Sequence, residues 1–297
     1  MMSAVTPLNL RIAISSSALF DLSAADQVFR EEGLAAYGEY QRAREKETLS
    51  PGPAFPLARK LLDLNAQEGI GLEVVLLSRN SADTGLRVFN SIQAHELPII
   101  RAAFTGGGAP YRYMLPFQCQ LFLSTNPIDV TDALDHGVAA ATVLVSRKPS
   151  NPDGPVKFAF DGDAVLFSDE AEQVYQREGL AVFAETERKA ADQPLTPGPF
   201  KPFLDQLNAI QSRFGEAACP IRTALVTARS SPSHERVIKT LRSWGVRVDE
   251  SLFLGGRDKT QFLRAYGADI FFDDQAEHCH LASREVVAGH VNHGVMN

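Results

Sequence analysis

The sequence contains few cysteines and no long apolar run. Cys119, Cys219 and Cys279 are its three cysteines among 297 residues, and no two of them are close in sequence. Neither a disulfide framework nor a thiolate zinc site is therefore expected, and a reducing compartment is favoured. No segment approaches the roughly 18 consecutive apolar residues that suggest a membrane span. Disulfide-dependent secreted domains and membrane-spanning proteins are thus not expected.

Basic residues are also scarce relative to acidic ones. The chain has 29 Lys and Arg against 36 Asp and Glu, which gives a net charge of -7. Such a chain repels the phosphate backbone of a nucleic acid, so a nucleic-acid polymer is not an expected partner. The first 20 residues have no basic leader, and serines at 15–17 interrupt their apolar stretch, so no export signal is expected. We therefore expect a cytoplasmic protein without a membrane partner.

What the chain does contain is an internal repeat. Residues 13–64 align without gaps over residues 159–210, a shift of 146, and 17 of the 52 positions are identical. After a slip of three residues the alignment continues at a shift of 149, which places Gly106-Gly107 over Gly255-Gly256. A self-similarity of this length indicates two diverged copies of one structural unit.

The repeat determines the expected domain organisation. Hydrophobic residues make up 44% of the chain, enough for the cores of one large domain or two ordinary ones. We predict a first unit over residues 1–150 and a second over 151–297, with the polar, Pro/Gly-rich segment 147–155 as the linker. Association of several copies into a homo-oligomer stays open.

Within each copy, short apolar runs alternate with helical patterns. This order predicts an α/β fold of two Rossmann-like units, with parallel sheets covered on both faces. The expected strands are residues 10–15, 72–77, 99–104 and 119–123 in the first copy, and 156–160, 221–226, 246–253 and 269–272 in the second.

Charged and hydroxyl side chains follow the strands of the second copy, where ligands of such sheets bind. They are Asp161, Asp163, Thr227, Arg229, Lys259, Asp273 and Asp274. Four carboxylates on one rim would repel each other, and Mg²⁺ with oxygen ligands is the usual compensation. Lys259, Thr227 and backbone N–H groups around Gly162 could hold the oxygens of a phosphoryl group. The implied substrate is a phosphate ester.

This set resembles the four motifs of the haloacid dehalogenase superfamily of phosphohydrolases: an Asp-x-Asp, a Thr or Ser, a Lys and an acidic pair. The resemblance implies that Asp161 is the nucleophile, which becomes an aspartyl-phosphate. It also implies that Asp163 protonates the leaving oxygen and then activates water. Thr227 and Lys259 would hold the phosphoryl oxygens.

The same resemblance implies a metal site at the rim. Asp161, the backbone carbonyl of Asp163 and Asp273 would bind Mg²⁺. Asp274 would either bind the metal as well or support the residues that do, because only the first carboxylate after the strand needs to face the ion. Mg²⁺ is the one cofactor expected.

A longer series of strings resembles the cytosolic type-I 5'-nucleotidase family within that superfamily. The strings are SSSALFD at 15–21, SPGPAFP at 50–56, TGG at 105–107, FDGDAVLFSDE at 160–170, LVTARS at 225–230, LRSWG at 241–245 and FFDDQ at 271–275. The family implies Mg²⁺-dependent hydrolysis of nucleoside 5'-monophosphates, AMP in particular, to nucleoside and phosphate. The helical insertion at about 168–196 has the position of a small cap over the substrate.

Two other functions stay open alongside this one. The first is a broader phosphatase, or a phosphotransferase that uses the same aspartyl-phosphate. The second is a nucleotide-binding regulatory protein without turnover, although binding alone would not need both Asp161 and Asp163.

Several further residues are candidates for contact with the substrate. In the second copy they are Gly162, Phe167, Ala228 and Arg229, and in the first copy Asn80 and Gly107. Arg229 either touches the phosphate or pairs with a rim carboxylate. Phe167 is either a core residue or a contact for the nucleotide base.

The first copy has lost the charged groups of this site. Ser15 aligns with Asp161, Ser17 with Asp163 and Pro110 with Lys259, and Ser124-Thr125 align with the acidic pair. Without carboxylates this rim can neither hold Mg²⁺ strongly nor form an aspartyl-phosphate, so we predict that it is catalytically dead. Its remaining role is structural support, a contribution to the substrate pocket, or binding of a regulatory nucleotide.

Four of the seven histidines cluster near the C-terminus, at 278, 280, 290 and 293. Such a cluster raises the hypothesis of a transition-metal site. The His-Cys-His spacing at 278–280 would bring the two imidazoles together only on a strand, whereas this stretch has a helical pattern. A surface or loop cluster is therefore the favoured interpretation.

Overall fold

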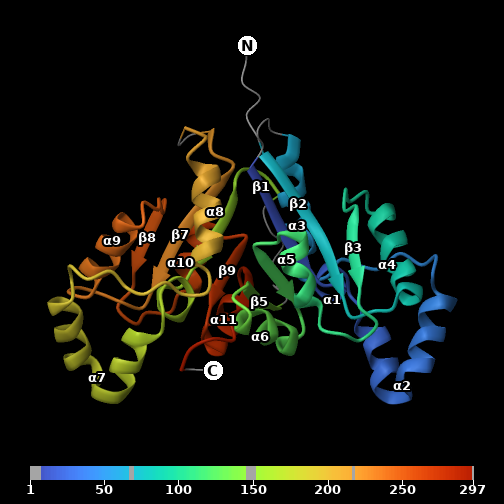
Figure 1. Ribbon diagram of the computed structural model, residues 1–297, viewed down its shortest axis with the longest axis horizontal. Helices are drawn as coiled ribbons and strands as arrows, with labels where there is room; N and C mark the ends of the chain where they lie inside the picture. The colour runs from blue at the N-terminus through green and yellow to red at the C-terminus, as the bar shows by residue number, and fades with distance from the viewer. Residues whose placement is uncertain (1–7, 67–69, 145–151, 216–217, 296–297) are drawn as a thin grey trace, which may run out of the picture.

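The structure is a computed structural model that describes residues 8–66, 70–144, 152–215 and 218–295 (Figure 1). Residues 147–151 of the predicted linker lie outside these ranges, as do the first seven residues of the segment considered for an export signal. In the described ranges the chain forms one sheet with helices packed against it.

The elements follow one another in the alternating order that the sequence predicts. The strands of the first half are β1 (Leu8–Ile14), β2 (Ile70–Ser78), β3 (Arg101–Phe104), β4 (Leu121–Ser124) and β5 (Ala139–Leu144). Its helices are α1 (Ser16–Leu19), α2 (Ser23–Ala43), α3 (Phe55–Asp63), α4 (Ala82–Ala94), α5 (Met114–Phe117) and α6 (Pro127–Asp135), with short turns η1 (Leu64–Ala66) and η2 (Pro110–Tyr113).

The second half repeats this order. Its strands are β6 (Val156–Phe160), β7 (Ile221–Thr227), β8 (Glu250–Phe253), β9 (Ile270–Asp273) and β10 (Val287–His290). Its helices are α7 (Glu170–Lys189), α8 (Lys201–Gln211), α9 (His234–Ser243), α10 (Thr260–Tyr266) and α11 (Ala276–Ala282), and the turn η3 (Gly162–Leu166) follows β6.

The sheet has the strand order β3-β2-β1-β4-β5-β10-β9-β6-β7-β8. Each half is parallel and has the same order, counted outward from the centre of the sheet. The register also repeats, because Ile12 pairs with Val74 in the first half and Phe158 with Thr223 in the second. These pairs are related by the shifts of 146 and 149 that align the sequence, so the repeat in the sequence is also a repeat in the backbone.

The two halves meet at an antiparallel pair of strands, β5 and β10, at the centre of the sheet. Gly289 of β10 pairs with Val143 there, and a side chain at this glycine would clash with the ring of Phe272 at 2.8 Å. Neither strand was predicted from the sequence, from which separate parallel sheets were expected. The structure instead shows one mostly parallel sheet with a single antiparallel junction.

The two long helices α2 and α7 bend at equivalent glycines. Gly33 has φ 87° and Gly179 has φ 80°, and each of these glycines divides its helix into two segments. In Figure 1 the bent helices project downward at the two ends of the molecule. An aromatic pair spans each bend, Phe29 with Tyr37 and Tyr175 with Phe183. The helical insertion expected at about 168–196 is thus α7 and its flanks, while its role as a cap stays a prediction.

The two Pro-Gly-Pro turns, at 51–53 and 197–199, pack against the loops that follow β1 and β6. Phe20 forms a short antiparallel bridge with Pro51, and Phe167 forms one with Pro197. At Gly198 a side chain would lie only 2.3 Å from the carbonyl oxygen of Phe167, so glycine is required there. These turns hold the loops that carry the candidate site residues.

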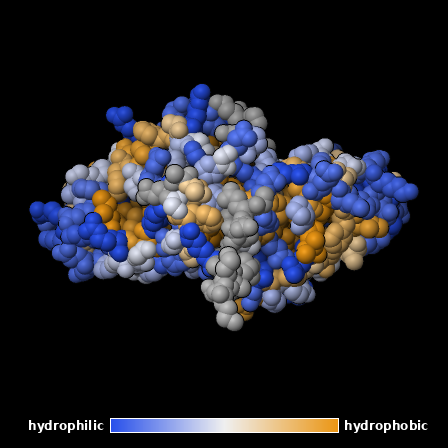
Figure 2. All heavy atoms as spheres, turned by 90° about the horizontal axis from the view of Figure 1, so that it is seen from above, coloured by the Kyte–Doolittle hydropathy of each residue, from blue (hydrophilic) through white to orange (hydrophobic). Residues whose placement is uncertain are grey.

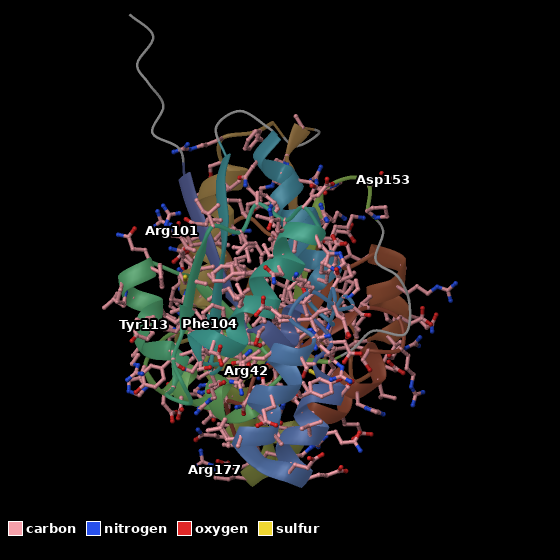
Figure 3. The ribbon with its side chains drawn as sticks, turned by 90° about the vertical axis from the view of Figure 1, so that its right-hand side faces the viewer. Arg42, Arg101, Phe104, Tyr113, Asp153 and Arg177 are labelled. Carbon is pink, nitrogen blue, oxygen red and sulfur yellow. The ribbon has the colours of Figure 1, made fainter. Side chains whose placement is uncertain are left out.

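The ends of the sheet are formed by the short strands β3 and β8. Figure 3 looks toward the β3 side, where Arg101 and Phe104 are labelled. Arg101 pairs with Glu73 of the neighbouring strand, and such a charge discourages pairing with another chain at this edge.

In the view of Figure 2 hydrophobic residues are interspersed among hydrophilic ones. Of the helices in the described ranges, none combines the length and the apolar character that crossing a membrane requires.

Candidate active site

The site begins at the end of β6, where the chain leaves the core. Phe160 is buried against the rings of Phe200 and Phe272, and the next residue is Asp161. The backbone N–H of Asp161 donates to the carbonyl oxygen of Phe272 at 2.8 Å. This hydrogen bond extends the pairing of β6 with β9 and fixes Asp161 beside the end of β9. The Asp161 side chain is almost completely buried.

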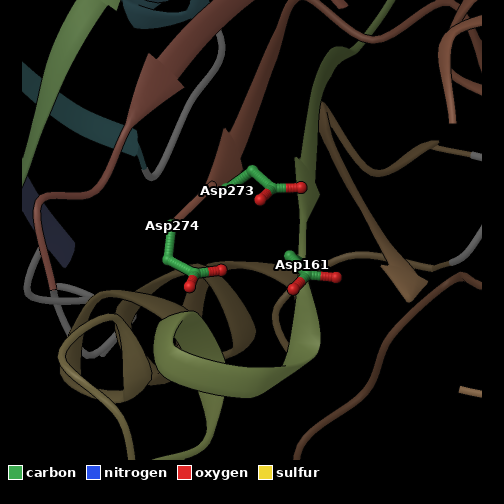
Figure 4. A group of neighbouring side chains, drawn as sticks. All are labelled: Asp161, Asp273 and Asp274. Carbon is green, nitrogen blue, oxygen red and sulfur yellow. The ribbon is translucent and has the colours of Figure 1, made fainter. Parts of the chain in front are cut away.

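Asp273 and Asp274 stand at the end of β9, as the sequence predicts. Carboxylate oxygens of Asp161, Asp273 and Asp274 lie within 4.8 Å of one another. Figure 4 shows the three carboxylates directed toward a common space from the ends of two neighbouring strands. All three residues are buried. The structure therefore brings together the three side-chain carboxylates that the sequence assigned to a metal.

Lys259 joins two of these carboxylates. Its Nζ donates to Asp161 Oδ1 at 2.6 Å and to Asp273 Oδ2 at 2.7 Å. The side chain comes from the start of α10, and only 5% of it is exposed. Burial disfavours the charged form of Lys259, but the two carboxylates outweigh this and raise its pKa. The ammonium group is therefore a permanent positive charge between Asp161 and Asp273.

The carboxylates differ in how easily they ionise. Burial raises the pKa of Asp161 to about 7, with Lys259 opposing the shift and Asp273 adding to it. Burial and the charges of Asp161 and Asp273 raise the pKa of Asp274 to about 9. Burial acts in the same direction on Asp273, but Lys259 and His278 outweigh it and lower its pKa to about 2. The single positive charge of Lys259 therefore does not compensate the negative charges of all three carboxylates.

This charge deficit and the donor atoms fit a hard divalent cation. Three ionised carboxylates and one ammonium carry two uncompensated negative charges, which a divalent cation would balance. Within the described residues this group offers oxygen donors alone, the type that Mg²⁺ prefers. The residues present are therefore suitable for Mg²⁺.

Asp163 forms an ion pair with Arg229. Arg229 Nε donates to Asp163 Oδ2 at 2.8 Å and Arg229 Nη2 to Asp163 Oδ1 at 2.7 Å. The third guanidinium nitrogen, Nη1, binds Glu187 of α7. Of the two roles that the sequence left open for Arg229, the structure shows pairing with a rim carboxylate.

The remaining candidates of the second half lie around this rim in different environments. Thr227 ends β7, and its Oγ1 accepts the backbone N–H of Arg229 at 3.2 Å. A side chain at Gly162 would lie 3.3 Å from the same oxygen. Ala228 is exposed. Phe167 is completely buried against Trp244, with ring centroids 5.5 Å apart, so its present position is that of a core residue.

Asn80 and Gly107 lie at the other rim, after β2 and β3, and are not brought to the carboxylates. They are close to each other, because the N–H of Gly106 donates to the Asn80 carbonyl oxygen at 3.0 Å. Asn80 Oδ1 accepts a hydrogen bond from Tyr37 of α2 at 3.1 Å. At this rim hydroxyl groups bond to one another, as between Thr125 and Ser17 at 2.5 Å.

Two residues at the site were not predicted. Glu187 is 2% exposed and binds both Arg229 and Arg236, the latter at 2.6 Å. His278 Nδ1 lies 3.2 Å from Asp273 Oδ2. His278 belongs to the C-terminal histidine cluster, of which the stretch 278–280 lies in α11, as its helical pattern predicts, and His290 ends β10. Glu187 aligns with the neutral Gln41 of the first copy, a difference in charge that could have singled it out.

Comparison with known proteins shows the family of this chain. A family model described as 5'-nucleotidase matches residues 2–297. The human protein named cytosolic 5'-nucleotidase 1B is 39% identical in an alignment 288 residues long, which covers 93% of this chain and 47% of the human protein. The chain thus spans about half the length of this curated relative.

One solved structure was also similar by overall comparison. It is a histidinol dehydrogenase from Elizabethkingia anophelis, at 11% identity and a TM-score of 0.24, over 95% of this chain and 52% of that one. A TM-score of this size carries no argument about fold or function.

Proposed function

Since the chain belongs to the 5'-nucleotidase family, we propose that it is a Mg²⁺-dependent 5'-nucleotidase. It hydrolyses nucleoside 5'-monophosphates, AMP above all, to nucleoside and phosphate. The relative named as a cytosolic 5'-nucleotidase supports this substrate class and a cytoplasmic location. The observation that carries the proposal is the group of three buried carboxylates around Lys259 at the ends of β6 and β9.

We further propose that the two halves of the sheet are tandem haloacid dehalogenase-like units. The unit of residues 151–297 performs the reaction, and the unit of residues 1–150 is catalytically dead. The helical insertion at about 168–196 covers the substrate as a cap and keeps bulk water from the reacting atoms. The strand order and register shared by the two halves support this division.

The first chemical step transfers the phosphoryl group to the protein. A carboxylate oxygen of Asp161 attacks the phosphorus atom, a new O–P bond forms, and the bond from phosphorus to the 5' oxygen breaks. Asp163 donates a proton to the departing 5' oxygen, so the nucleoside leaves as a neutral alcohol. Thr227 and Lys259 hold the phosphoryl oxygens.

The second step returns the protein to its initial state. Asp163, now ionised, takes a proton from a water molecule, and the water oxygen attacks the phosphorus atom of the aspartyl-phosphate. The O–P bond to Asp161 breaks, inorganic phosphate leaves, and Asp163 holds the proton for the next cycle. Each residue thus ends the cycle in the form in which it began.

Asp161, Asp273, Asp274 and the backbone carbonyl of Asp163 would hold Mg²⁺. When bound, the ion neutralises the carboxylates and the phosphoryl oxygens, so that a negatively charged nucleophile can approach a negatively charged ester. Lys259 contributes a second positive charge at the same place.

Phosphate release from a panel of nucleoside and other monophosphates, with and without Mg²⁺, tests the proposal. We expect release from nucleoside 5'-monophosphates in the presence of Mg²⁺ and its loss in the Asp161→Asn variant. Asn has the shape of Asp but cannot serve as the nucleophile.

Two results would contradict parts of this proposal. Activity that survives Asp161→Asn would overturn the assignment of the nucleophile. A wild-type protein that binds nucleoside monophosphates but releases no phosphate would favour the non-catalytic alternative. Adding a second nucleoside as acceptor separates transfer from hydrolysis, because transfer produces a new monophosphate.

A further inference from the structure

A chain of four alternating charges connects the bent helix α7 with Asp163. It runs from Asp163 through Arg229 and Glu187 to Arg236. The side chains of Arg229 and Glu187 in the middle of the chain are 3% and 2% exposed. The Arg229 guanidinium also lies 5.4 Å from the ring of Phe183, which belongs to α7. The position of α7 therefore determines where Arg229 lies.

All three nitrogens of the Arg229 guanidinium bind carboxylates in this chain. Nε and Nη2 bind the two oxygens of Asp163, and Nη1 binds Glu187. A planar guanidinium that binds both oxygens of a carboxylate fixes the plane of that group. Glu187 in turn prevents Arg229 from rotating away. The orientation of Asp163 is thus set from α7 through two successive ion pairs.

The first half of the sheet shows which part of this arrangement packing requires. Gln41 of α2 aligns with Glu187 and accepts a hydrogen bond from Arg87 at 3.0 Å, and Arg87 aligns with Arg236. The contact of the bent helix α2 with α4, which corresponds to that of α7 with α9, is therefore kept with a neutral side chain. A glutamine is sufficient to hold a helix of this kind in place.

The first half keeps an arginine at the position of Arg236 but lacks the other three charged members of the chain. Asn80 stands where the second half has Arg229, and Ser17 stands where it has Asp163. The charge at Glu187 accompanies the presence of Asp163, whereas the packing contact occurs in both halves. This contrast assigns the negative charge of Glu187 to the reaction rather than to folding.

We propose that Glu187 is a positioning residue, which through Arg229 holds the carboxyl group of Asp163 in the orientation for proton transfer to the leaving oxygen. This inference rests on the proposed function, in which Asp163 is the general acid. Beyond the proposed function, it means that the insertion carrying α7 orients the group that transfers the proton.

The test compares two esters with different leaving groups in the variant Glu187→Gln. A nucleoside or a simple alkyl alcohol needs a proton to leave, whereas p-nitrophenolate leaves without one. The kcat/KM of each ester reports the first bond cleavage and not the later hydrolysis of the aspartyl-phosphate. The substitution is compatible with the packing of the helix, because Gln41 makes the equivalent contact in the first half.

We expect Glu187→Gln to lower kcat/KM for nucleoside monophosphates and for a simple alkyl phosphate by about 10- to 100-fold, because a small displacement of a catalytic group has this effect. The kcat/KM for p-nitrophenyl phosphate should change less than about 3-fold, since proton transfer contributes little to that reaction. Arg229→Lys keeps the positive charge but cannot bind both oxygens of Asp163 as the guanidinium does. This variant should show the same difference between the two kinds of ester. The control is Glu185→Gln, at a partly exposed residue of α7 that pairs with Arg188, and it should leave the kcat/KM of both esters unchanged.

Equal losses for both esters in Glu187→Gln and Arg229→Lys would overturn the inference and leave a structural role. No loss for either ester would also overturn it. A wild-type protein that hydrolyses neither ester contradicts the proposed function and this inference with it. Melting temperatures of all variants identify a loss that comes from unfolding, and Arg229→Lys then decides the question if Glu187→Gln does not fold.

Discussion

The two halves of the sheet have the same backbone and different charges at the ends of their strands. Asp273 Oδ1 accepts the backbone N–H of Gln275 at 2.8 Å, and in the equivalent place Ser124 Oγ accepts the N–H of Asn126 at 3.1 Å. The serine thus keeps the hydrogen bond that shapes the turn. It lacks the second oxygen, which in Asp273 binds Lys259. One side chain can lose its chemistry and keep its structural contact.

The same separation holds for the bent helices. Gly33 and Gly179 keep the bend, and the aromatic pairs that span it are at matching positions. The contacts toward the rim differ, because Tyr37 of α2 donates to Asn80 whereas Glu187 of α7 binds Arg229. Packing within a shared sheet therefore constrains both halves alike, whereas the proposed chemistry constrains only the second.

The largest expected effect comes from giving the second rim a residue of the first. Asp273→Ser should lower kcat by about 10³-fold or more, because it removes a carboxylate that contacts Lys259 and the expected metal. The turn should persist, since serine makes the same backbone contact at Ser124. Ser124→Ala is the matched control and should change kcat less than about 2-fold. A large loss in the control would show that the first rim takes part in the reaction.

The next effect concerns a buried ion pair that joins the two halves. Lys60 of α3 binds Asp269, which precedes β9, at 2.8 Å, and both side chains are buried. Lys60→Met removes the ammonium partner of a buried carboxylate, which then keeps the backbone N–H of Lys157 as a donor, and should lower the free energy of unfolding by about 3–5 kcal/mol at pH 8. Gln206→Met, at the position equivalent to Lys60, should cost less than about 1 kcal/mol.

The pH dependence of the Lys60→Met effect follows from Asp269. Burial raises the pKa of Asp269, and the hydrogen bond from Lys60 opposes this, so removing Lys60 raises that pKa further. A carboxyl group with a higher pKa in the folded state binds more protons there, and stability then rises as the pH falls. Denaturant unfolding should show a smaller deficit at pH 5 than at pH 8. A deficit independent of pH would mean that Asp269 is not the cause.

A smaller effect should follow from adding Mg²⁺. An ion that binds only the folded protein stabilises it by about 2.7 kcal/mol at 100 times its dissociation constant, which thermal unfolding would detect. Asp274→Asn should reduce this stabilisation, whereas Thr125→Ala in the first half should leave it unchanged. An equal reduction by both variants would remove the distinction between the rims.

The stabilisation by Mg²⁺ should decrease as the pH falls from 9 to 6. The pKa values of Asp161 and Asp274, about 7 and about 9, mean that both groups hold protons at pH 6, which the ion must displace. Because both values lie above those of the unfolded chain, the protein without Mg²⁺ should lose stability as the pH rises through this window. Stabilisation that grows toward pH 6 would contradict the carboxylate site.

The smallest effect tests what the halves have in common. Gly33→Ala and Gly179→Ala should each lower the free energy of unfolding by about 1–3 kcal/mol, because both positions have a positive φ that alanine rarely adopts. No atom lies within 4 Å of the added carbon at either site, so the cost comes from the backbone alone. Costs that differ by more than about 1 kcal/mol would show that the two bends are not equivalent.

Most of the strands and four of the site carboxylates, Asp161, Asp163, Asp273 and Asp274, could be predicted from the sequence. The strand at Val156–Phe160 is an apolar run, and the structure confirms both of its ends. Asp161 and Asp273 lie at the carboxyl ends of β6 and β9, where parallel sheets bind their ligands. The strands β5 and β10 were missed because AAATVL and VAGH are short and alanine- or glycine-containing, with a weak strand signal. Glu187 was missed because it lies in a charged helix that resembles a solvated surface.

The sequence by itself determined the repeat, the order of elements in each copy and which copy carries the acidic groups. These properties depend on residue type and local spacing. Only the tertiary structure decided that the halves join through an antiparallel pair, that Lys60 meets Asp269, and that Arg229 lies between Asp163 and Glu187. Ion pairs and ladder hydrogen bonds act over a few ångströms and depend on direction, so residues distant in the chain form them only where the packed sheet places them.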